Sequence, residues 1–168
     1  MQPRCLFRMA KAHLTYLTCG LLLKRLYHSY NTRRTIMNLK QETFQNFGKT
    51  FQENLCHLML QDRTFCDQIS EVLDIDFIQY EYLRVFTTFL LDYRAKYRQH
   101  PSYETMATII TSEVGKYTDG LKKQITQFYS KVINNNEIES CDFIKDHAID
   151  FCRKQVLKKA MIQSVKLL

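Results

Sequence analysis

The chain has 168 residues, of which 45% are hydrophobic and 12% aromatic, so it can bury the core of one ordinary domain and is not intrinsically disordered. Only four Gly and two Pro are present, which is too little turn chemistry for a β-sandwich or a β-barrel and predicts an all-α fold with short connections. The formal net charge of +7 resembles that of nucleic-acid-binding proteins, but the charges are not spread evenly along the chain.

Residues 1–36 form a basic leader that precedes the patterned part of the chain. Residues 1–40 hold eight of the 24 Lys and Arg and no acidic residue, so the remainder carries 16 basic and 17 acidic side chains, a net charge of −1. A near-neutral body is a poor phosphate binder, because that affinity needs clustered Lys and Arg. We favour a start site assigned too early, with Met37 as the second start; a transit peptide and a functional arm are the alternatives. The uncharged run from Ala12 to Leu23 falls short of the roughly 20 residues that a membrane-spanning helix needs, so we expect no membrane anchor.

Apolar residues at steps of three and four predict two helices after the leader. The first begins near Phe47, and the second is capped by Asp62 and ends near the acidic turn 74–76. The inward residues of the first are Phe51, Leu55, Leu58 and Met59, and those of the second are Phe65, Ile69 and Val72.

Three more helices complete the globular domain that we predict for residues 37–134. A long helix runs from about Ile78 to Tyr97 and is stopped by the Pro at position 101. Ser102 caps the next helix, and Asp119 opens a fifth that ends at the Asn triplet 134–136. With the first two helices, this predicts a small bundle of about four helices, followed by a C-terminal hairpin.

The last helix starts near Ser140, and no Gly or Pro stops it before Leu168. At about 1.5 Å per residue it would be roughly 40 Å long, so part of its apolar face must meet another element or another chain. The short Asn-rich turn predicts that residues 135–168 form the second arm of a hairpin with the fifth helix and continue into a linker beyond the sequence. The candidate oligomer interface, facing inward or toward a partner, is Phe128, Val132, Phe151, Leu157 and Met161.

Two short motifs could in principle carry chemistry. Gly48-Lys49-Thr50 matches the end of a phosphate-binding P-loop, but Thr43 stands where the first glycine belongs and no buried strand precedes it. Arg94, Lys96 and Arg98 alternate with tyrosines, a pattern that can hold a single-stranded nucleic acid, although an amphipathic helix end explains it as well.

Cysteine and histidine give no catalytic or metal site. The six Cys include no C-x-x-C pair, which disfavours zinc, and Cys56, Cys66 and Cys152 fit small core residues in a reducing compartment. We interpret His57 and His147 as packing residues. The sequence therefore predicts no catalytic residue, no cofactor and no metal.

Several segments resemble the N-terminal domain of DnaB-type replicative helicases. Glu53 to Asp62, an acid followed by a Leu-rich run and an Asp, is similar to that domain's opening helix. Asp76-Phe77 resembles the acid-Phe pair before its long helix, Val85-Phe86 the centre of that helix, and Pro101-Ser102 the turn that follows. Phe143 to Gln155 is similar to the helix in which the family's N-terminal part forms its hairpin. The similarity covers about Phe44 to Leu168, and Cys56-His57, where bacterial members carry Gly and a small residue, indicates the phage-like branch.

This resemblance implies a non-catalytic collar domain that mediates oligomerisation and partner docking in DNA replication. It implies self-association as a dimer, with a hexamer in the parent protein, and docking of a primase or a helicase loader. DNA would be contacted through a RecA-like motor domain that follows in the same polypeptide, so we expect no helicase activity from this chain alone. The implied location is the cytoplasm of a bacterial or phage-infected cell, with no membrane association.

Two other classes of function stay open. An imported helical adaptor protein would make the leader an organellar transit peptide, which removal of the leader at a defined site in cells would reveal. A single-stranded nucleic-acid-binding module would use Arg94, Lys96 and Arg98, and its salt-dependent binding would survive deletion of residues 1–36.

Overall fold

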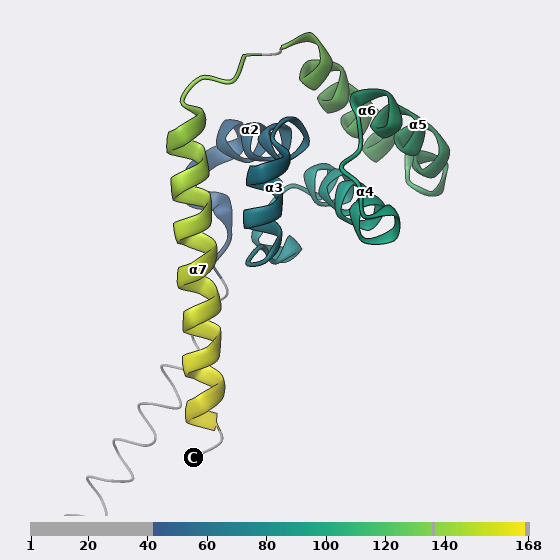
Figure 1. Cartoon of the computed structure of the whole chain (residues 1–168). Helices are drawn as coiled ribbons and strands as arrows, with labels where there is room; N and C mark the ends of the chain where they lie inside the picture. The colour runs from purple at the N-terminus through teal and green to yellow at the C-terminus, as the bar shows by residue number, and fades with distance from the viewer. Residues whose placement is uncertain (1–41, 136, 167–168) are drawn as a thin grey trace, which may run out of the picture. The chain divides into compact units, whose positions relative to one another are not determined.

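The computed structural model describes residues 42–135 and 137–166, with side chains described up to position 164, and within these ranges every regular element is a helix. The all-α fold class is therefore confirmed (Figure 1). The predicted leader, residues 1–36, and Met37 lie outside the described residues. The elements in chain order are η1 (Phe44–Phe47), α2 (Gly48–Gln61), α3 (Arg63–Ser70), η2 (Ile75–Phe77), α4 (Glu81–Tyr97), α5 (Tyr103–Glu113), η3 (Val114–Lys116), α6 (Asp119–Asn134) and α7 (Cys141–Lys166).

Side-chain caps set the starts of two helices, as the sequence predicted. The Asp62 carboxylate accepts a hydrogen bond from the backbone N–H of Phe65 at 3.0 Å, and the Ser102 hydroxyl accepts one from Thr105 N–H at 3.2 Å. Helix α4 begins at Glu81 rather than near residue 78, because Ile75–Phe77 forms a separate 3-10 turn.

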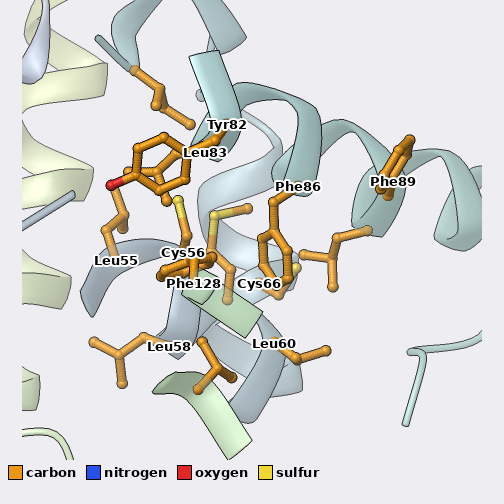
Figure 2. Packing of buried hydrophobic residues seen from close by; sticks show 14 of the residues in the cluster. Leu55, Cys56, Leu58, Leu60, Cys66, Tyr82, Leu83, Phe86, Phe89 and Phe128 are labelled. Atoms are coloured by element: carbon orange, nitrogen blue, oxygen red, sulfur yellow. The ribbon is translucent and has the colours of Figure 1, made fainter. Parts of the chain in front are cut away.

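The centre of the core lies between α2, α4 and α6 (Figure 2). Leu55 and Cys56 of α2, Leu83 and Phe86 of α4 and Phe128 of α6 come together in this cluster. The rings of Phe86 and Phe128 meet edge to face with centroids 5.0 Å apart. Because burying one such side chain stabilises a fold by about 1.5–3 kcal/mol, this three-helix contact is a principal source of stability.

A second cluster of rings fastens α7 to the start of the domain. This phenylalanine cluster consists of Phe44, Phe47, Phe51, Phe77 and Phe151. Phe44 is fully buried at its centre, with its ring centroid 4.6 Å from that of Phe151. The midpoint of α7 is therefore anchored to η1, α2 and η2.

The position of α7 corrects the predicted C-terminal hairpin. Helix α6 packs mainly on α4 and α5, whereas α7 packs on α2 and α3, and Figure 1 shows α6 and α7 on different sides of α2. The physical reason is that Ile144, Ala148 and Cys152 fill the side of α2 and α3 that α4 and α6 leave open. None of the described helices combines the length and apolar character needed to cross a bilayer.

Candidate functional site

One face of α7, which we call the inner face, is packed into the domain. It consists of Ile144, Ala148, Cys152 and Gln155, all buried. The buried Gln155 amide keeps a hydrogen-bond partner, because its Nε2 donates to Glu42 Oε2 at 3.1 Å. These residues follow one another at steps of three and four, as expected for one helical stripe.

Ion pairs hold α7 in this position along its length. Lys145 Nζ lies 2.7 Å from Asp62 Oδ2, and Lys158 Nζ lies 2.7 Å from Glu42 Oε1. The Lys145 hydrogen bond, together with the Phe65 N–H, lowers the pKa of Asp62, and the hydrogen bond from Lys158 lowers the pKa of Glu42. Both carboxylates are thus held in the charged form that keeps the pairs intact.

Away from the inner face, the C-terminal half of α7 exposes three large apolar side chains. Val156, Leu157 and Met161 are 46%, 62% and 62% exposed, and we call these three residues the outer face of α7. At about 100° per residue, Leu157 and Met161 lie about 200° and about 240° around the helix from the buried Gln155, whereas Val156 lies about 100° away, at the edge of this face. Large exposed apolar groups on a helix whose other face is already buried are typical of an interaction surface.

The five predicted interface residues fall into two groups in the structure. Phe128 and Val132 are buried in the domain core, and Phe151 is half-buried in the phenylalanine cluster. Leu157 and Met161 are exposed on the outer face of α7. Val156, the third exposed apolar residue there, was not predicted from the sequence, because it falls outside the spacing of three and four residues that joins Leu157 to Met161.

The predicted basic cluster at the end of α4 is brought together only in part. Arg94 and Arg98 line one pocket, and Arg63 of α3, which the sequence analysis missed, lines it with them. Lys96 does not line this pocket, and its Nζ lies 4.9 Å from the centroid of the Tyr97 ring. The spacing alone predicts that Lys96 is separate from Arg94 and Arg98, since residues four apart share a helix face and residues two apart do not.

The P-loop-like fragment Gly48-Lys49-Thr50 forms the first turn of α2. Gly48 has φ +81°, a value that favours glycine, at the junction between η1 and α2. Lys49 Nζ lies 3.7 Å from Glu53 Oε1, and Thr43 caps η1 with its hydroxyl. The fragment therefore ends η1 and begins α2, a local role that does not need a phosphate.

The described cysteines are free, and burial governs their chemistry. Burial raises the pKa of the Cys56 and Cys152 thiols to about 12 and that of Cys66 to about 11, so all three are protonated and unreactive at neutral pH. His57 is buried too, its Nε2 has no hydrogen-bond partner among the residues that the structure describes, and burial lowers its pKa. Across residues 42–135 and 137–166, no group of three or more His, Cys, Asp or Glu side chains is arranged to hold a metal ion.

No protein-family model matches this chain, and neither a curated protein nor a solved structure matches it.

Proposed function

We propose that this chain is a non-catalytic assembly domain that self-associates through the outer face of α7. The observation that carries the proposal is the exposure of Val156, Leu157 and Met161 on a helix whose other face is packed and ion-paired. A helix face that stays in solvent needs no large apolar side chains, because polar residues serve there equally well. Burying large apolar side chains, by contrast, favours association by up to about 1.5–3 kcal/mol for each.

A two-fold pair of α7 helices is the simplest closed arrangement that uses this surface. In such a pair both copies use the same patch, so each apolar residue of the patch is buried in both copies. Leu157 and Met161 are four residues apart and hence adjacent on one helix face, as helix-to-helix packing requires. Arg153 and Lys154 flank them and would form a polar rim.

We further propose that this assembly domain is the N-terminal collar of a DnaB-type replicative helicase. The support is the order of three resembling segments along the chain: Glu53 to Asp62 spans the C-terminal part of α2 and the residue that ends it, Asp76-Phe77 precedes the long α4, and Pro101-Ser102 precedes α5. The segment Phe143 to Gln155 lies on α7, which does not form the hairpin that the resemblance implied. In this function the chain forms dimers, and hexamers in the parent protein. It docks a primase or a loader, and the motor domain of the same polypeptide handles DNA.

The mass of the full chain in solution tests the assembly proposal. Light scattering over a dilution series should give a dimer at about 100 μM that dissociates on dilution, since a small two-fold interface of this kind binds in the micromolar range. A strict monomer at about 100 μM would remove the basis for the proposal. The collar assignment has its own test, which is capture of a primase or a loader by the dimer but not by a monomeric variant.

A further inference from the structure

A pocket between α3 and the C-terminal half of α4 is lined by three arginines. The cavity has a volume of about 390 Å³, and the polar residues that line it are Arg63, Asp67, Ser70, Arg94, Arg98, Gln99 and His100. We call it the arginine pocket. It lies apart from the outer face of α7, since none of its lining residues belongs to that helix.

Arg94 forms the fixed wall of this pocket. Its guanidinium donates to Asp67 Oδ1 and lies 3.2 Å from Nδ1 of His100, whose Nε2 lies 2.7 Å from the carbonyl oxygen of Leu60. Because a carbonyl can only accept, Nε2 of the neutral ring donates and Nδ1 accepts from Arg94. The chain of bonds from Asp67 to Leu60 therefore holds Arg94 and His100 in place before any ligand arrives.

Arg63 and Arg98 keep their donors available. Arg63 touches Asp67 only at 4.0 Å with its side chain 72% exposed. Arg98 is exposed and forms no ion pair with any described residue. A guanidinium is a planar fork of five N–H donors that matches the oxygens of phosphate, so two such groups can grip one anion from two sides.

The charge of the pocket favours a dianion. Three arginines and one aspartate line it, which leaves two positive charges unmatched. The helix dipoles add little, because α3 begins at Arg63 and α4 ends beside Arg98, so a positive and a negative end both lie here. A phosphate monoester carries about −1.5 to −2 at neutral pH, whereas a phosphodiester carries about −1.

The backbone of Arg98 is a second observation that concerns the same side chain. This residue ends α4 with φ 57°, in the left-handed conformation that glycine adopts easily and that the Cβ of other residues disfavours. Glycine would serve the helix end better. The presence of arginine is explained if its guanidinium has a role in the pocket.

We propose that the arginine pocket binds a phosphate dianion, either free phosphate or the phosphate of a monoester, with Arg63 and Arg98 as its direct ligands. Arg94 is a positioning residue, since its hydrogen bonds to Asp67 and His100 hold the wall of the pocket in place. The inference is independent of the assembly proposal, because it uses different residues and a different surface.

The test is a titration of the full chain with inorganic phosphate at constant ionic strength, followed by nuclear magnetic resonance of the His100 ring and the Arg98 amide. We expect saturable shifts with a dissociation constant of about 1–10 mM, as a small anion held by few bonds would give. Arg98→Gly should weaken binding roughly tenfold, the value of one charge-assisted hydrogen bond, and leave the melting midpoint unchanged or higher. Arg63→Gln should weaken binding similarly.

Lys123→Gln is the matched control, because it removes one positive charge from an exposed position on α6 and should leave phosphate binding unchanged. Thymidine 5′-monophosphate should bind at least as well as free phosphate if the natural source is a monoester, and worse if it is free phosphate. A dithymidine phosphodiester should bind severalfold more weakly than either. The proposal is overturned if no shift saturates, if both arginine variants bind like the control, or if the diester binds best. Should Arg98→Gly fail to fold, Arg63→Gln decides alone.

Discussion

The substitution Leu157→Asp tests the outer face of α7 most directly. Leu157 is 62% exposed in the single chain, so a two-fold contact buries that fraction of the side chain in each copy. With about 1.5–3 kcal/mol for a fully buried Leu, the two copies together lose about 2–4 kcal/mol of association free energy. This corresponds to a dimer constant weakened by roughly 30- to 1000-fold, before the cost of placing two carboxylates in the interface is added.

The fold itself should tolerate this change, because a substitution at an exposed helix position costs about 0.5 kcal/mol. Sedimentation equilibrium of the full chain at several concentrations measures the dimer constant, and circular dichroism checks that the helices remain. Ile133→Asp is the matched control, since Ile133 on α6 is 48% exposed and off the proposed surface. A Leu157→Asp chain that still forms the wild-type dimer would refute the reasoning, and dissociation by Ile133→Asp instead would place the interface on α6.

Three other features of the chain give expected results. Asp62→Ala removes the cap on Phe65 and the pair with Lys145, so denaturation at pH 7 should show a loss of about 1 kcal/mol, while Asp62→Asn keeps a cap and loses less. Because the fold lowers the pKa of Asp62 from 3.8, the gap between wild type and Asp62→Ala should hold above that pH and close as the pH falls through the lower folded value; a gap that grows in acid would contradict this. Residues 37–168 should melt close to the full chain, and a midpoint lower by about ten degrees or more would mean that the leader is packed structure. We expect no ATP hydrolysis, and micromolar ATP binding abolished by Lys49→Ala would contradict that.

Helix positions were predictable where the determinants are local in sequence. Asp62 and Ser102 cap the N–H groups of residues three positions later, so the starts of α3 and α5 can be read from the sequence. The stripe of α4 that includes Phe86, Phe89 and Leu90 was predictable for the same reason, since its period lies within one helix. The 3-10 turn at Ile75–Phe77 was not, because it competes with an equally plausible extension of α4.

The partner of α7 could not be read from the sequence, because its determinants are distant along the chain. Gln155 reads as a solvent residue until Glu42, 113 positions earlier, supplies its hydrogen bond. Phe151 is fixed by Phe44 in the same way. The short turn between α6 and α7 suggested that the two helices form a hairpin. The inner face of α7 packs instead on the side of α2 and α3 that α4 and α6 leave uncovered.

The arginine pocket, too, could be predicted only in part, because its residues come from two helices that are distant along the chain. Arg94 and Arg98 were visible as a basic pair on one helix, but Arg63 and Asp67 reach them from α3 across 27 or more residues of sequence. Lys96 was predicted to act with Arg94 and Arg98, because a run of charges in the sequence does not by itself show which residues share a helix face. The period of the helix separates Lys96 from the pair, and only the structure adds α3 to it.

The packing of α7 also restricts how copies of this chain can assemble. Exchanging α7 between two copies would first expose Ile144, Ala148 and Cys152 and take Phe151 out of the phenylalanine cluster. With about 1.5–3 kcal/mol for each of the larger side chains and less for Ala148, the opened chain lies several kcal/mol above the folded domain, and this is a barrier to exchange, because an exchanged α7 re-forms the same contacts in the other copy. The ion pairs of Lys145 and Lys158 would break in the same step. Association through the outer face breaks none of these contacts and meets no such barrier, so folded copies of this chain should associate through that face faster than they exchange their last helix.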